Sequence, residues 1–415
     1  MNSSPSHGHS HAHGGRWQTG ARIERSLWAT VAAWALATLI GLVLLWPSAR
    51  TGSGYRTDPT VHGSVVAVEV GACTGTAVED LIECRRLTIQ LTTGANRGEQ
   101  AVLEQGITGS DLRQPEIGDT LVLTETVLAD GSTVYNFADY ERASSMWLLV
   151  VLFVVAVVAL GRWRGVGALA GLALSIAVLV MFVLPALLGG SNPVVVAIVG
   201  ASVIAFASLY LAHGFGAATN VALLSTLAAL TLTGVLAWVF IELTTLTGLS
   251  DENSLFLDAL GVNVDPRGLL LAGVVIGALG VLDDVTVTQV SAVGELHRAN
   301  PDLSFRELYR SALVIGRDHI SSTVNTLFLA YVGAALPLLL LFTEVREAIA
   351  STAMREQVAV EIVRTLVGSI GLVAAVPIST GLAAAVLMAR ATPALPTPSS
   401  AVPTGSADAS RPHSD

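Results

Sequence analysis

The chain has 415 residues, of which 52% are hydrophobic and 13% are charged. Soluble globular proteins carry roughly 25% charged residues, so this composition predicts an integral membrane protein. The formal net charge is -10 and the basic residues form no single block, which argues against a nucleic-acid-binding protein. The same figures exclude collagen-like, disordered and disulfide-scaffold chains.

Eight segments are apolar over most of the length that a membrane-spanning helix needs, which is about 20 residues. The sequence therefore predicts an α-helical polytopic membrane protein with about eight transmembrane helices. We interpret the first segment as a retained helix and not a signal peptide, because its apolar run is long and Trp46-Pro47 is a poor cleavage site. The eight segments are residues 27–46, 146–160, 166–188, 193–211, 221–243, 268–290, 323–342 and 362–388.

Arginine residues gather at alternate ends of these segments, which by the positive-inside rule indicates the cytoplasmic side. The sequence thus predicts a bacterial plasma-membrane protein with both termini in the cytoplasm and residues 60–142 outside. The arginines that carry this prediction are Arg16, Arg22, Arg25, Arg162, Arg164, Arg298, Arg306, Arg310, Arg317 and Arg390.

The two ends of the chain are polar. Residues 1–26 are His-rich, with alternate histidines from His7 to His13, and residues 391–415 are rich in Pro, Ser and Ala. Both ends are predicted to be disordered cytoplasmic tails. No closed tetrahedral metal site can be built from the histidine tract alone, so no metal is assigned, and whether the tract binds one stays open.

Residues 60–142 alternate between apolar and polar side chains in several short runs. The runs are 61–70, 86–92, 120–127 and 134–138, and the last two are separated by an Asp130-Gly131 turn. Short strands with turn residues between them predict a small β-rich domain of OB-like type between the first two helices. Residues 146–390 then form a predicted seven-helix membrane domain.

The chain has two cysteines, Cys73 and Cys84, and both fall in the predicted outer domain. An oxidising compartment favours disulfide formation, so we expect one bridge between them. Their spacing is not that of a redox-active CxxC motif.

The strongest chemical signal is an acidic pair, Asp283 and Asp284, inside the sixth apolar segment. Ionisable residues within a membrane span are rare and are candidates for function. Adjacent buried carboxylates are rarely both ionised, so one of them is a candidate for proton uptake and release. A helix-packing or interfacial role for the pair is the alternative.

Helical spacing places the pair at the end of a stripe of small residues. Gly273, Gly277, Gly280 and Asp284 share one helix face, which Thr288 continues. Such a stripe predicts a ridge on which a neighbouring helix packs closely.

The seventh apolar segment follows a run of charged and amphipathic residues, 295–318, which is typical of a helix lying on the membrane surface. Polar residues then occur at its start, and we expect Asn325 and Thr326 to face the aspartate pair across the helix bundle. Capping of a helix end by these residues is the alternative interpretation.

Several motifs together resemble the YibE/F-like family of bacterial multi-span membrane proteins over about residues 60–390. They are VHGSVV at 61–66, Gly118-Asp119, YNFADY at 135–140, GALGVLDDVTVTQ at 277–289 and GRDHISSTVNTLFL at 316–329. The resemblance implies an inner-membrane protein with a β-rich outer domain and implies no particular substrate.

A second, shorter resemblance concerns residues 277–287 together with the linker and polar span that follow. This region is similar to the proton-relay region of RND-type exporters and of the SecD/SecF translocation partners. In those proteins an intramembrane aspartate takes up the proton, so the resemblance implies such a role for Asp283 or Asp284. The large paired outer domains of those exporters are absent from this chain.

These observations favour a proton-coupled transporter or permease component for an unknown small solute or ion. The coupling candidates are Asp283, Asp284, Thr288, Asn325 and Thr326. The alternative is a non-transporting scaffold whose outer domain binds an envelope partner. We expect no enzyme activity, because an intramembrane aspartyl hydrolase would need catalytic aspartates on two different spans. No cofactor is predicted, the lipid bilayer is the expected environment, and homo-oligomerisation, substrate and transport direction stay open.

Overall fold

The computed structural model describes residue 17 and residues 20–47, 59–72, 83–106, 113–128, 131–249, 264–344 and 349–389. These residues form two compact units, one made of residues 52–165 and the other of residues 1–51 and 166–415. The first unit contains a β-sheet and the second is helical. The protein is thus a polytopic helical membrane protein that also carries a small β domain, as predicted.

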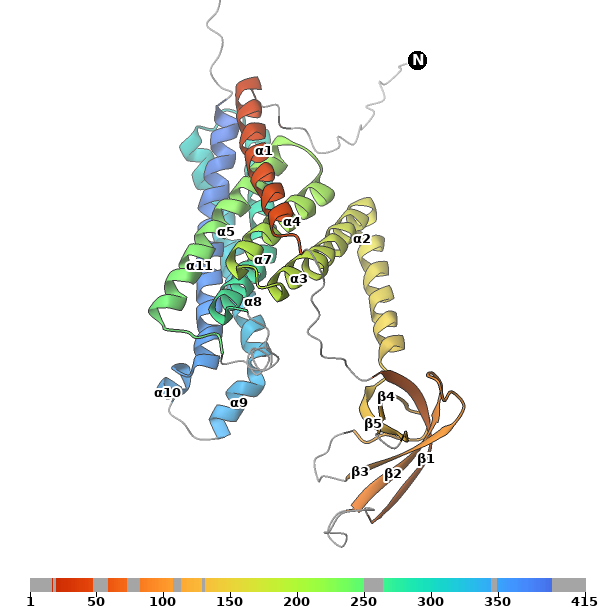
Figure 1. Cartoon of the computed structure of the whole chain (residues 1–415). Helices are drawn as coiled ribbons and strands as arrows, with labels where there is room; N and C mark the ends of the chain where they lie inside the picture. The colour runs from red at the N-terminus through yellow and green to blue at the C-terminus, as the bar shows by residue number, and fades with distance from the viewer. Residues whose placement is uncertain are drawn as a thin grey trace, which may run out of the picture. The chain divides into compact units, whose positions relative to one another are not determined.

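The β domain is one antiparallel sheet of five strands that curves into a half-barrel (Figure 1). Its strand order is β3-β2-β1-β4-β5. Alternate side chains on one face form the core, including Leu87, Ile89, Leu121 and Leu123, each fully buried. The strands are β1 (Thr60–Ala72), β2 (Glu83–Leu91), β3 (Gln100–Gly106), β4 (Thr120–Val127) and β5 (Thr133–Tyr140).

Strand β3 is absent from the sequence-based prediction. It pairs with β2 from Cys84 to Gln90 and places Ala101 and Leu103 in the core. The polar residues around these two positions hide its alternation. The side chains between Ala101 and Leu103 and beyond point away from the core and are exposed, as Val102 shows. The segment is a strand because its backbone pairs with β2.

The predicted disulfide stays a prediction, because Cys84 lies in β2 but Cys73 falls outside the described residues. We expect neither thiol to react with an alkylating reagent, before reduction, in protein isolated from the cell envelope. Closing a loop of this length stabilises a domain by about 3 kcal/mol, so Cys73→Ser should lower the melting temperature of the β domain. Mass spectrometry after alkylation decides the matter, and modification of both thiols without reduction would reject the bridge.

The second and third predicted spans lie in a single helical run, Ala143–Leu188, of 46 residues. The run comprises α2 (Ala143–Val178), a π-helical turn η1 (Leu179–Val183) and α3 (Leu184–Leu188). Its regular backbone is broken at Arg162, where φ is 50° and ψ is -132°. Left-handed φ values are uncommon for a residue with a side chain, so the break marks a junction between two helical segments.

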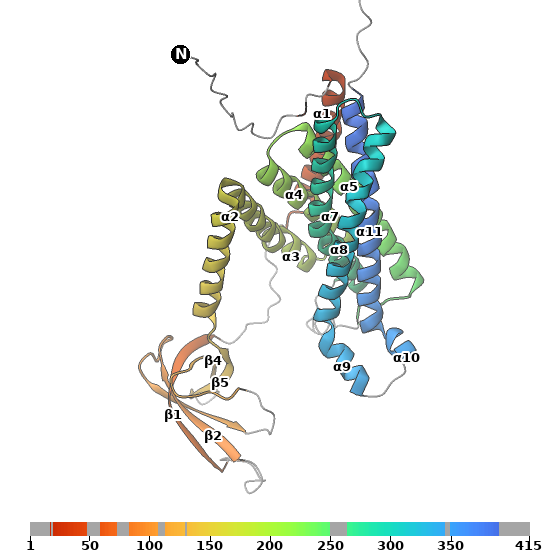
Figure 2. The ribbon, with the colours of Figure 1, turned by 180° about the vertical axis from the view of Figure 1, so that it is seen from behind.

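The helical unit packs around α5, α7 and α11, which contact one another. Figure 2 shows α7, α8 and α11 side by side. Buried apolar side chains from these helices and from α4 form one continuous core. The helices are α1 (Ala21–Leu44), α4 (Pro193–His213), α5 (Ala217–Leu243), α7 (Pro266–Ala299), α8 (Phe305–Ala334), α9 (Leu336–Glu344), α10 (Ile349–Ala353) and α11 (Glu356–Met388).

Six helices in the described part of the chain are long and apolar enough to cross a membrane. A seventh is obtained if α8 and α9, which meet at a 59° bend, form one broken span. The predicted eight additionally requires the run Ala143–Leu188 to cross twice. The number eight therefore stays a prediction.

One sequence-based interpretation is wrong. Residues 295–318 do not form a separate surface helix, because residues 295–299 end α7 and residues from Phe305 onward belong to α8 without interruption. Ser304 and Glu307 form a capping box that starts α8. Leu308 and Ala312 of this segment are buried in the bundle core, whereas Phe305 and Ile315 are exposed.

Candidate functional site

Asp283 is positioned by α7 against α4. Its Oδ2 atom accepts a hydrogen bond of 2.9 Å from the hydroxyl of Ser208. Its Oδ1 atom is buried and has no hydrogen-bond partner in the described residues. A carboxylate with one unpartnered buried oxygen is costly within a membrane span unless a proton or a cation accompanies it.

A cavity of about 370 Å³ adjoins this carboxyl group and lies between α2, α4 and α7. Asp283 and Gly280 line it from α7, while Ser208 and His213 line it from α4. His213 is the last residue of α4 and is exposed, so the cavity extends from the helix end to the aspartate. The site therefore combines a carboxyl group on an apolar helix with open space and a histidine.

Two glycines of α2 allow that helix to pass close to α4 beside the cavity. A Cβ atom at Gly167 would lie 2.7 Å from the carbonyl oxygen of Leu211, and one at Gly171 would lie 3.4 Å from Cα of Ser208. Small residues four positions apart are a common means of bringing membrane helices into backbone contact. Here they fix the wall of the cavity opposite Asp283.

Asp284 lies on a different face of α7. It is exposed and forms no ion pair or hydrogen bond within the described residues. Gly273 and Thr288 share this exposed face, and Gly280, which is also exposed, lies at its border with the cavity. A Cβ at Gly273 or Gly280 would meet nothing within 4 Å, and one at Gly277 would lie 3.5 Å from the Tyr331 hydroxyl. Among the residues that the structure describes, no helix packs closely on the predicted glycine ridge.

Asn325 and Thr326 are exposed on α8. The Thr326 hydroxyl donates to the carbonyl of Ser322, and neither residue forms a hydrogen bond with either aspartate. The structure thus joins Asp283 to α4 and not to these α8 residues. The adjacent aspartates differ because a helix turns by about 100° per residue, which directs them toward different surroundings.

The sequence model of the YibE/F-like protein family matches residues 149–389, which is more than half of the chain. The chain belongs to the YibE/F-like family. No curated protein and no solved structure matches it. The matched region contains α4, α7 and every residue that lines the Asp283 cavity, whereas strands β1–β5 precede it.

Within the family-matched region, buried polar contacts continue from the aspartate toward the bundle core. The Thr286 hydroxyl donates to the backbone carbonyl of Asp283 and contacts the Thr226 hydroxyl of α5 at 2.6 Å. One turn further along α7, the Gln289 amide donates to Thr380 of α11 and to the carbonyl of Ala312, each at 2.8 Å. Through Thr286 and Gln289, these contacts connect α7 to α5, α8 and α11 within two turns of Asp283.

Ser208, the partner of Asp283, is the residue that sequence reasoning missed. Neither of the two serines in the apolar run of α4, Ser202 and Ser208, gives a signal by itself, because serine is frequent in membrane helices and hydrogen-bonds its own backbone. His213 appears in the sequence only as a residue of a short turn. Its proximity to the aspartate cavity depends on how α4 packs on α7.

Proposed function

We propose that this YibE/F-like protein is a proton-coupled membrane transporter or permease component and that Asp283 is its coupling residue. The single observation that carries the proposal is the Asp283 carboxyl group at the wall of a cavity, with one oxygen bonded to Ser208 and the other unpartnered. Such a group changes its charge at least cost by exchanging a proton. The transported solute is a small molecule or ion whose identity the site does not specify.

The cavity distinguishes this proposal from a membrane scaffold. A scaffold requires its buried carboxyl groups to be tightly packed and dry, whereas a transporter requires water to reach them. The cavity of about 370 Å³ beside Asp283 supports the transporter. The exposed His213 at the end of α4 supports access from the side that the arginine distribution assigns to the cytoplasm.

Water access to the cavity is a direct test. In a background lacking Cys73 and Cys84, Ser175→Cys places a thiol in the cavity lining, and Ala205→Cys places one at a fully buried position of α4. With a membrane-impermeant thiol reagent and inverted membrane vesicles, we expect Ser175→Cys to be modified and Ala205→Cys to stay unmodified. Labelling is read by mass spectrometry.

Equal protection of both thiols in inverted vesicles would indicate a dry cavity and favour the scaffold. Labelling of Ser175→Cys in intact cells instead of inverted vesicles would reverse the proposed topology. Purified protein in proteoliposomes with an imposed pH gradient then provides the functional assay. Solute uptake that depends on the gradient supports coupling, and proton flux with no dependence on Asp283 contradicts it.

A further inference from the structure

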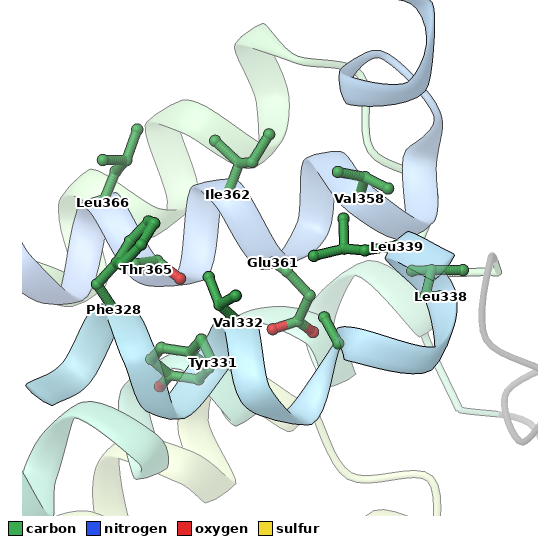
Figure 3. Close-up of a pocket in the computed structure, with 11 residues that line it drawn as sticks. Phe328, Tyr331, Val332, Leu338, Leu339, Val358, Glu361, Ile362, Thr365 and Leu366 are labelled. Atoms are coloured by element: carbon green, nitrogen blue, oxygen red, sulfur yellow. The ribbon is translucent and has the colours of Figure 1, made fainter. Parts of the chain in front are cut away.

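A second cavity, of about 160 Å³, lies where α8 and α9 pass α11 (Figure 3). The chain bends by 59° between α8 and α9, and α9 borders the cavity with Leu338 and Leu339. Most of the lining is apolar, and the side chains that define its shape are Phe328, Val332, Leu338, Leu339, Ile362 and Leu366. The cavity shares no lining residue with the one at Asp283.

The lining also contains a hydroxyl group without a protein partner. Thr365 is 8% exposed, and its hydroxyl forms no hydrogen bond with any described residue. In contrast, the buried threonines Thr233 and Thr380 donate to the carbonyl four residues earlier in their own helices. Because its hydroxyl has no partner among the described residues, Thr365 is available to pair with a polar group of a ligand.

The charge at the cavity is balanced within the protein. Glu361 lines the cavity, and its carboxylate accepts a hydrogen bond of 2.7 Å from Arg364, one turn further along α11. A ligand carboxylate would meet the like charge of Glu361, and a ligand ammonium would have to compete with Arg364. The polar group that fits this lining is therefore uncharged.

Exposed apolar side chains border the open side of the cavity. Phe328 is 51% exposed and Leu366 is 57% exposed, although both lie on helices of the membrane unit. Thr365 lies in α11, three residues inside the predicted span 362–388. A ligand reaches this cavity from the hydrocarbon phase, which favours a molecule with an apolar chain.

We propose that the cavity between α8, α9 and α11 binds a membrane-dissolved molecule that has an apolar chain and one uncharged hydrogen-bonding group. The chain occupies the apolar lining, and the polar group pairs with the Thr365 hydroxyl. Tyr331 also lines the cavity, but its hydroxyl lies beside Gly277 of α7, which is not part of the lining. This site is independent of the role of Asp283.

The test uses the full-length protein in lipid nanodiscs and a long-chain alcohol that carries a photoreactive diazirine. Leu339→Trp fills the cavity, and Leu340→Trp is the matched control, because Leu340 is 62% exposed and does not line the cavity. We expect saturable labelling of α8, α9 and α11 peptides in the wild type and in Leu340→Trp. Labelling should fall to the non-specific level in Leu339→Trp.

Thr365→Val removes the hydroxyl at nearly constant volume and should weaken binding of the alcohol about fivefold, the value of one hydrogen bond. A fatty acid and an alkylamine of the same chain length should compete poorly. Melting temperatures confirm that each variant is folded. Labelling that does not saturate, or that is equal in the two tryptophan variants, would show contact with bulk lipid only and overturn the proposal. Equal competition by all three head groups would overturn it as well.

Discussion

Asp283→Asn is expected to abolish the pH-dependent activity of this protein while leaving the fold intact. Asparagine keeps the shape of the side chain and can still accept the hydrogen bond from Ser208, but it cannot exchange a proton. Loss of a positioned proton-transfer group lowers rates by roughly 100-fold or more. Asp283→Glu should retain partial activity with a shifted pH profile, because the longer side chain titrates from a displaced position.

Asp284→Asn is the matched control, because it makes the same chemical change at the neighbouring exposed residue. Activity and pH profile should stay close to those of the wild type. Infrared difference spectroscopy provides a readout that needs no substrate. The part of the pH-dependent carboxyl band that comes from Asp283 should be missing in Asp283→Asn and present in Asp284→Asn. A wild-type pH profile in Asp283→Asn would refute the coupling role and leave the scaffold as the better interpretation.

Gly371→Ala should be the most destabilising of the conservative changes in the helix bundle. A Cβ at Gly371 would lie 2.0 Å from Oγ1 of Thr233, so α5 and α11 would have to separate. Thr233 is fully buried and donates its hydroxyl to Ala229, which leaves it no space to move aside. Overpacking of this kind costs about 1–3 kcal/mol, and the melting temperature of purified protein should fall accordingly.

Two further variants make this second prediction specific. Gly273→Ala adds the same methyl group where nothing lies within 4 Å, so it should leave the melting temperature unchanged or raise it. Thr233→Ala combined with Gly371→Ala should restore part of the stability, because the nearest remaining atom would be Cβ of residue 233 at 3.1 Å. Equal melting temperatures for Gly371→Ala and Gly273→Ala would contradict the packing seen between α5 and α11.

Much of the architecture follows from the sequence because it depends on local patterns. Long apolar runs predicted the membrane helices, alternation predicted four of the five strands, and the carboxyl groups inside an apolar run identified α7 as the helix of interest. Each of these features depends on the period of one element and on the cost of burying charge. The motifs at residues 277–289 and 316–329 predicted the family.

Tertiary packing decided which residues of these elements meet. Helical periodicity shows that Gly273, Gly280 and Asp284 share a face, but it carries no information about what lies opposite that face. The structure leaves this face of α7 exposed and brings α4 to Asp283, while the tightest glycine contact occurs at Gly371. Contacts between helices depend on crossing positions set by many side chains at once, whereas a period depends on one helix alone. For that reason the sequence identified the acidic pair, and only the packed bundle distinguished Asp283 from Asp284.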